Sequence, residues 1–85
     1  MRTAEKLSQK IADARYKMAV AMTRAERHYW AGVVDGLTAV RRSPRRAEAL
    51  ARRAEREAAL AKERLDYAAE SYHNGVCAGI AEGRA

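Results

Sequence analysis

The sequence has no phenylalanine, one tryptophan and one cysteine. The single cysteine, Cys77, excludes an internal disulfide, so we expect a reducing, cytoplasmic setting rather than a disulfide-stabilised secreted scaffold. A chain of 85 residues allows one small domain, residues 1–85, and the scarcity of large aromatic side chains makes its hydrophobic core thin. Small chains with thin cores often need oligomerisation for stability, and we therefore expect self-association.

Long apolar runs are also missing. The most apolar stretch, YWAGVVDGLTAV at 29–40, has 12 residues and includes Asp35, so it is too short to cross a bilayer. The first ten residues, MRTAEKLSQK, are polar and lack the apolar segment of a signal peptide. We therefore expect neither a membrane span nor a membrane partner.

Alanine, at 20 positions, and arginine, at 13, are the abundant residues. Both are strong helix formers. The formal net charge of +6 is uneven, because residues 41–65 carry nine basic and four acidic residues, whereas residues 66–85 carry one basic and three acidic residues. The composition predicts an all-α protein whose basic side chains gather in the middle of the sequence.

Small and apolar residues recur at steps of three and four, which is the pattern of helices packed on one face. The first series runs from Ala4 to Val40 and the second, which includes Leu65, from Ala47 to Gly79. The one proline lies between them in Ser43-Pro44, where serine caps a helix and proline is its first residue.

These signals predict two long helices, about 3–42 and about 44–83, joined by a turn at about 42–44. A short connection makes the helices antiparallel, so the predicted fold is an all-α helical hairpin. A break of the first helix at Gly32–Gly36, giving three helices, is the main alternative.

The five glycines lie at helical spacing and predict close helix packing. A glycine within a helix costs about 1 kcal/mol relative to alanine, so the pattern is favourable only where another backbone approaches. GxxxG pairs in membranes use the same arrangement. The candidate close-packing residues are Gly32, Gly36, Gly75, Gly79 and Gly83.

An internal similarity relates residues 29–37 (YWAGVVDGL) to residues 72–80 (YHNGVCAGI), at an offset of 43. In a single hairpin Gly75 is not level with Gly32, but in an antiparallel dimer of hairpins Gly75 is level with Gly32 of the other chain. The similarity therefore favours a homodimeric four-helix bundle or a higher oligomer.

A second apolar stripe lies on the face of the first helix opposite its packing series. Aromatic residues beside an arginine, here Arg27, are typical of protein interfaces, and exposed apolar stripes mark interaction sites. We expect this stripe to bind a second copy, a different protein, or both. The candidate interface residues are Tyr16, Val20, Trp30, Val34 and Leu37.

Arginines around the central turn form a candidate anion-binding site, which suggests a basic nucleic-acid-binding protein as the alternative function. Interleaved glutamates weaken this interpretation. A second alternative is an oligomer whose interface holds a small anionic ligand such as a nucleotide. The candidate anion-binding residues are Arg41, Arg42, Arg45, Arg46, Arg52 and Arg53.

No residue pattern indicates catalysis, and we expect no catalytic residues, no cofactor and no bound metal. Asp66, Glu70, His73 and Cys77 share one helical face, as metal ligands can. That face is nearly opposite the glycines of the same helix, so these side chains point away from the expected partner helix. The hydroxyl residues lie in no nucleophile motif, and no glycine loop for phosphate is present.

The sequence therefore predicts a small non-enzymatic interaction protein: a regulator, inhibitor or adaptor from a bacterium, phage or mobile element. Its motifs do not identify a family.

Overall fold

The computed structural model describes residues 3–85, which form four α-helices and no strand: α1 (Thr3–Val20), α2 (Arg24–Arg42), α3 (Pro44–Glu63) and α4 (Tyr67–Arg84). The prediction of an all-α fold is confirmed. Four helices replace the two long ones expected, because a three-residue turn interrupts each of those near its middle. Within residues 3–85, no helix combines the length and apolar character needed to cross a membrane.

Thr23 starts a new helix in the middle of the first expected one. Its backbone is extended (φ −119°, ψ 158°), and its hydroxyl oxygen accepts a hydrogen bond of 3.0 Å from the Glu26 backbone N–H. Thr23 and Glu26 have the spacing of a capping box, which marks a helix start. The apolar periodicity continues across this turn, so the periodicity alone predicts one helix where the cap makes two.

Leu65 ends α3 and separates it from α4. It has a left-handed backbone (φ 57°), while its N–H donates to the Lys62 carbonyl at 3.1 Å and the next N–H, of Asp66, donates to the Ala61 carbonyl at 2.9 Å. This pair of bonds is the Schellman motif, which usually contains glycine at the left-handed position. The Asp66 carboxylate then caps α4 by accepting from the Ala69 N–H at 3.1 Å. Because leucine replaces the usual glycine, the sequence gives no obvious stop signal here.

The central reversal lies at Ser43 and Pro44. The Ser43 hydroxyl accepts a hydrogen bond of 3.3 Å from the Arg46 N–H, and Pro44 occupies the first position of α3. Helix α2 continues without interruption through Gly32 and Gly36. The alternative of a break at these glycines is therefore wrong.

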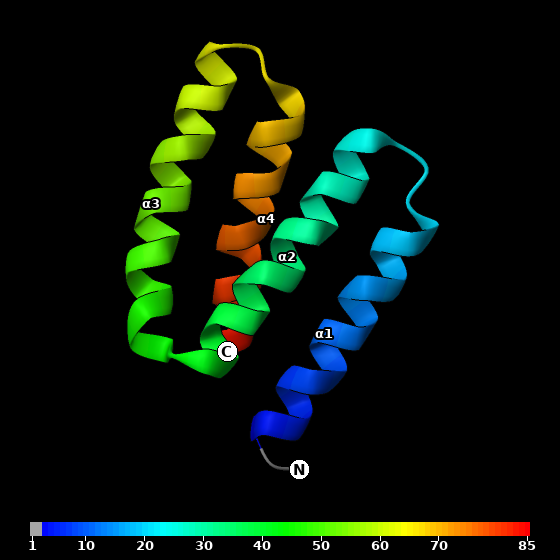
Figure 1. The fold of residues 1–85 in the computed structure, drawn as a ribbon, viewed down its shortest axis with the longest axis vertical. Coiled ribbons are helices and arrows are strands. Elements are labelled where there is room, and N and C mark those ends of the chain that lie inside the picture. Colours follow the sequence, from blue (N-terminus) through cyan, green and yellow to red (C-terminus); the bar gives the residue numbers. More distant parts are fainter. Residues whose placement is uncertain (1–2) are drawn as a thin grey trace.

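The four helices form two hairpins, α1–α2 and α3–α4, which meet where α2 crosses α4 (Figure 1). Helices α2 and α4 run in the same direction, with α1 packed on α2 and α3 packed on α4. The molecule is flat, with principal extents of 41 × 30 × 15 Å. The buried apolar residues are Leu7, Ile11, Ala14, Val33, Leu37, Val40, Ala47, Ala54, Ala58, Ala61, Val76 and Ile80.

Glycines make the crossing of α2 and α4 close enough for backbone contact. A methyl group on Gly32 would overlap the Tyr72 carbonyl oxygen and lie 3.0 Å from the Gly75 Cα. A methyl group on Gly75 would in turn overlap the Tyr29 carbonyl oxygen and lie 3.1 Å from the Gly32 Cα. These contacts are reciprocal, as in an interface between two identical subunits.

The second glycine pair repeats this arrangement, since a methyl group on Gly36 would lie 3.1 Å from the Gly79 Cα. Gly83 differs, because the nearest atoms to its added methyl group would be those of the Val40 side chain, at 3.1–3.3 Å. Glycine is therefore required by backbone contact at the first two pairs and faces only a side chain at Gly83.

The similarity at an offset of 43 covers both hairpins. It relates the turn at 21–23 to the turn at 64–66, and the cap Thr23 to the cap Asp66. The two hairpins are thus arranged like the subunits of a dimer within one chain. The glycine contacts that suggested a homodimer are made inside the chain, so this argument for a dimer no longer holds.

Candidate functional site

The exposed large apolar side chains of residues 3–85 gather at one end of the molecule, which we call the apolar end. They lie in the last two turns of α1 and α3, in the turns that follow, and at the first residue of α4. Both turns lie at the end opposite the Ser43 turn (Figure 1). The residues are Tyr16, Val20, Met22, Leu60, Leu65 and Tyr67.

Met22 and Leu65 occupy equivalent positions in the two turns, each directly before the residue that caps the next helix. In many proteins an apolar residue at this position packs on the residue four places after the cap. Here those residues are Arg27 and Glu70, which are polar. The side chains remain uncovered, with Met22 88% exposed and Leu65 68% exposed.

The expected interface stripe is divided by the fold. Tyr16 and Val20 are exposed and belong to the apolar end, whereas Trp30 and Val34 are half-buried. The expectation that Leu37 is available to a partner is wrong, because α1 folds back over α2 and leaves Leu37 only 1% exposed. The break at Thr23 causes this difference.

Four residues of the apolar end lie outside the predicted stripe: Met22, Leu60, Leu65 and Tyr67. The Thr23/Glu26 capping box and the helix-capping residue Asp66 are the sequence signals that could have revealed the two turns. With those turns assigned, both Met22 and Leu65 are loop residues, and Leu65 is no longer expected in the second apolar series.

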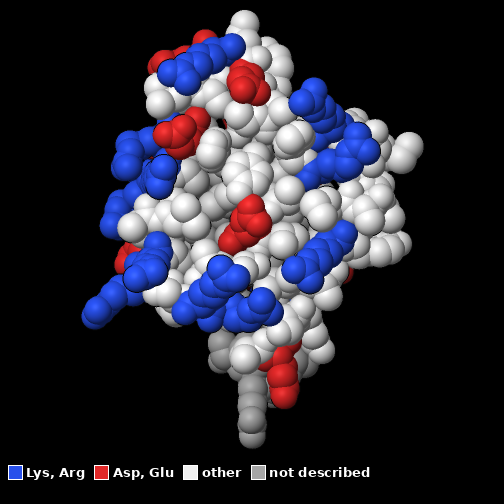
Figure 2. Space-filling model, in the orientation of Figure 1, with Lys and Arg blue, Asp and Glu red and all other residues white. Residues whose placement is uncertain are grey.

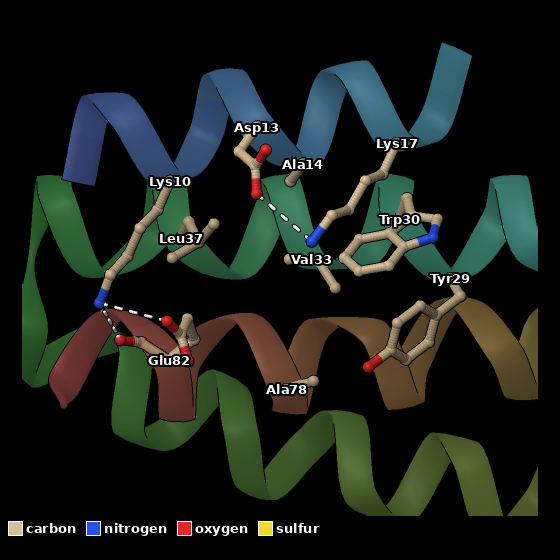
Figure 3. A pocket seen from close by; sticks show the side chains of 10 residues that line it. All are labelled: Lys10, Asp13, Ala14, Lys17, Tyr29, Trp30, Val33, Leu37, Ala78 and Glu82. Atoms are coloured by element: carbon tan, nitrogen blue, oxygen red, sulfur yellow. Dashed lines mark hydrogen bonds and ion pairs between the residues drawn. The ribbon is translucent and has the colours of Figure 1, made fainter. Parts of the chain in front are cut away.

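A groove of about 310 Å³ separates α1 from α4, with Val33 and Leu37 of α2 at its base (Figure 3). The Lys17 ammonium lies 4.8 Å from the centre of the Trp30 ring and 3.3 Å from the Asp13 carboxylate. At this distance the cation and the indole attract each other. Trp30 therefore lines the α1–α4 groove beside Lys17, and the charge of Lys17 is paired with Asp13.

The second lysine of the α1–α4 groove is also paired. Lys10 lies 3.4 Å from the Glu82 carboxylate and donates a 2.9 Å hydrogen bond to the Glu82 backbone carbonyl (Figure 3). Both lysines in this groove thus have carboxylate partners within the chain. Their charges are largely compensated, which makes the groove a poor site for an anion.

The two-hairpin arrangement produces an equivalent groove of about 320 Å³ between α2, α3 and α4. Lining residues of this second groove are 43 positions from lining residues of the first: Lys10 and Arg53, Tyr29 and Tyr72, Trp30 and His73, Val33 and Val76. The two grooves thus occupy equivalent positions in the two hairpins, but their lining side chains differ in chemistry.

Tyr72 lines the second groove and connects two of its helices. Its hydroxyl donates a hydrogen bond to the Asp35 carboxylate. Burial, then this hydrogen bond, and then the Asp35 charge raise the pKa of Tyr72 from 10.0 to about 12. The bond joins α2 to α4 across the groove and favours the neutral form of the phenol at high pH.

Cys77 is half-buried, and its thiol donates a weak hydrogen bond of 3.5 Å to the Ala51 carbonyl. Burial and the nearby Glu55 charge raise the pKa of Cys77, which lowers its reactivity. Asp66, on the same predicted stripe, is used as a helix cap. In the part of the chain that the structure describes, His, Cys, Asp and Glu side chains form no group of three or more able to hold a metal ion.

The predicted anion-binding arginines are exposed and lie along α3 and around the Ser43 turn. Basic side chains gather over these two elements in Figure 2. Between residues 3 and 85 no carboxylate lies within ion-pair distance of these guanidinium groups. Arg42 and Arg46 also line a groove of about 540 Å³ beside Ser43. The residues are Arg41, Arg42, Arg45, Arg46, Arg52 and Arg53.

Comparison of the chain with models of known protein families, with curated proteins and with solved structures gave no match.

Proposed function

We propose that this chain is a small non-enzymatic interaction protein that binds a protein partner through its apolar end. The observation that carries the proposal is the position of the exposed large apolar side chains, which gather at the end that holds the two hairpin turns. Exposed apolar clusters mark interaction sites on soluble domains. A regulator, inhibitor or adaptor would use such a surface.

The chain has more accessible surface than a compact monomer of its mass, which supports binding to a second molecule. Its accessible area is 5889 Å², whereas a compact monomer of 9.4 kDa has about 5000 Å². The excess follows from the flat shape, since the shortest extent is 15 Å. A second molecule would cover part of this additional surface.

The chemistry of the apolar end also suits a protein partner. Tyr16 and Tyr67 are 65% and 62% exposed, and arginines flank both turns, at Arg24, Arg27 and Arg64. Tyrosine and arginine are enriched among the residues that contribute most to protein binding. The end thus combines apolar anchors with charged neighbours that could form the rim of an interface.

Substitution at the two tips tests this proposal. Met22→Gln combined with Leu65→Asn removes the most exposed apolar groups, and asparagine tolerates the left-handed backbone at position 65. The matched control, Glu5→Gln with Lys6→Gln, changes two exposed residues at the start of α1, far from the apolar end. The partner is captured from the native host, identified by mass spectrometry, and its Kd is measured by calorimetry with each purified variant.

We expect the tip variant to raise the Kd for the captured protein by at least about thirtyfold, the effect of losing about 2 kcal/mol at one strong contact. The control variant should bind within about threefold of the original protein, because surface charges away from an interface contribute little. Equal binding by the original protein and the tip variant would contradict the proposal.

A further inference from the structure

A basic surface on α3 ends at Arg56, one helical turn before Leu60 of the apolar end, and has a different chemistry. Arg45, Arg52 and Arg56 are separated by seven and four residues, a spacing that places them in one row along the helix. The buried residues of α3 lie on the opposite side, so the row faces solvent. Glu48 lies beside this row, three residues after Arg45 and four before Arg52.

A second row lies about a quarter of a turn away and contains Arg46 and Arg53, which are also seven residues apart. These two arginines line the grooves between α2 and α3. We call the two rows together the arginine face. It consists of Arg45, Arg46, Arg52, Arg53 and Arg56.

The guanidinium groups of the arginine face are free to bind an external anion. In the described chain none of them lies within ion-pair distance of a carboxylate, and Glu48 on the same helix is paired with Arg84 at 3.6 Å. The first turn of α3 contains no acidic residue, so the positive end of the helix dipole adds to the attraction at Arg45.

Residues 41–56 contain seven arginines and no lysine. The planar guanidinium group forms paired hydrogen bonds with phosphate, whereas lysine provides a point charge. The first row is about 16 Å long at 1.5 Å per residue. Along the axis of duplex DNA that length spans about five phosphates of each strand, at 3.4 Å per charge, of which three arginines could contact three.

From this arrangement we infer that the arginine face binds the phosphate backbone of nucleic acid without reading its sequence. The surface is distinct from the apolar end, so the inference does not depend on the protein partner. The Glu57 carboxylate lines the groove beside the second row and disfavours a polyanion there, which places the contacts on the first row.

Two variants of equal charge test the inference. Arg45→Gln, Arg52→Gln and Arg56→Gln remove the first row, whereas Arg15→Gln, Arg24→Gln and Arg27→Gln remove three exposed arginines of α1 and α2. Each triple variant lowers the net charge from +6 to +3. Binding of a short fluorescein-labelled DNA duplex is followed by fluorescence anisotropy between about 50 and 200 mM salt, and circular dichroism confirms that each variant is folded.

We expect the row variant to lose affinity at least about tenfold at about 100 mM salt and the slope of log K against log salt to fall by about 2.7, or 0.9 for each lost phosphate contact. The α1–α2 variant should keep most of the slope. Equal losses in both variants would show that net charge alone acts, and would overturn the inference.

Three further outcomes would also overturn it. The first is no binding of the duplex by the original protein at about 100 mM salt. The second is displacement of the duplex by a free nucleotide at an equal concentration of phosphate groups, which would indicate a small-anion site. The third is binding of polyglutamate in place of the duplex, which would make the arginine face a surface for acidic proteins.

Discussion

Leu65 combines two properties that oppose folding. It is the one non-glycine residue between positions 3 and 85 with a positive φ, at 57°, and its apolar side chain is 68% exposed. A left-handed backbone costs a residue with a side chain about 1–2 kcal/mol. Residues held in unfavourable conformations are concentrated at functional sites, so Leu65 supports a binding role for the apolar end.

Replacing Leu65 with glycine should stabilise the fold. Glycine is the usual residue of this motif, so Leu65→Gly should raise the free energy of unfolding by about 1 kcal/mol, or the Tm by about 4–8 °C. The equivalent change in the other turn, Met22→Gly, relieves no strain and should lower stability by about 0.5–1 kcal/mol. Thermal unfolding followed by circular dichroism measures both. A lower Tm for Leu65→Gly would contradict the assigned backbone conformation.

Tyr72 provides a pH-dependent contribution to stability. Its pKa is raised from 10.0 to about 12, chiefly by burial and next by the bond to Asp35, so the folded state favours the neutral phenol. The contribution is therefore complete below pH 10 and is lost as the pH rises from 10 to 12.

The difference between the ultraviolet titrations of the original protein and Tyr72→Phe should have a midpoint near 12. In an Asp35→Asn background the same difference should have a lower midpoint, because the charge and the accepted hydrogen bond are changed. A midpoint that does not move in that background would show that Asp35 does not affect the phenol.

Helix packing was more predictable than helix ends. The spacing of Leu7, Ile11 and Ala14 places these residues in the core, as periodicity suggests. The turns were missed because their signals are local side-chain bonds, at Thr23 and Asp66, and because leucine stands where glycine usually ends a helix. Apolar periodicity records which face is buried and is insensitive to a turn that preserves the spacing.

The α2–α4 crossing should tolerate no side chain at its centre. Gly75→Ala places a methyl group 2.9 Å from the Tyr29 carbonyl carbon and 3.1 Å from the Gly32 Cα, where backbone cannot rotate away. Overpacking costs about 1–3 kcal/mol, more than the gain of about 1 kcal/mol in helix propensity. Gly83→Ala meets only the Val40 side chain, at 3.1–3.3 Å, and should lose less stability than Gly75→Ala because a side chain can adjust.

Urea unfolding compares these two variants. An unfolding midpoint for Gly75→Ala at a higher urea concentration than that of the original protein would contradict this account. It would show that the α2–α4 backbone contact does not require glycine at position 75.

The molecule as a whole is a pair of similar hairpins with chemically different ends. The glycine contacts that suggested a dimer of two chains are made within a single chain. Each hairpin contributes one glycine-containing helix, α2 or α4, to the crossing. The sequence could indicate the repeat over residues 29–37 and 72–80, but the dimer-like arrangement of both hairpins depends on the turns at 21–23 and 64–66. Those same turns expose Met22 and Leu65 and bury Leu37, which redirects the candidate interface from a helix face to an end of the bundle.

The most direct test of the proposed function asks where the partner touches the chain. A photo-crosslinking amino acid replaces Tyr67 at the apolar end or, as the control, Gln9, which is exposed on α1 away from that end. After illumination in the native host, crosslinked proteins are identified by mass spectrometry. We expect one protein to be crosslinked at position 67 and not at position 9. Crosslinking of that protein at position 9 alone, or of nucleic acid alone, would contradict the assignment of the apolar end as the protein-binding surface.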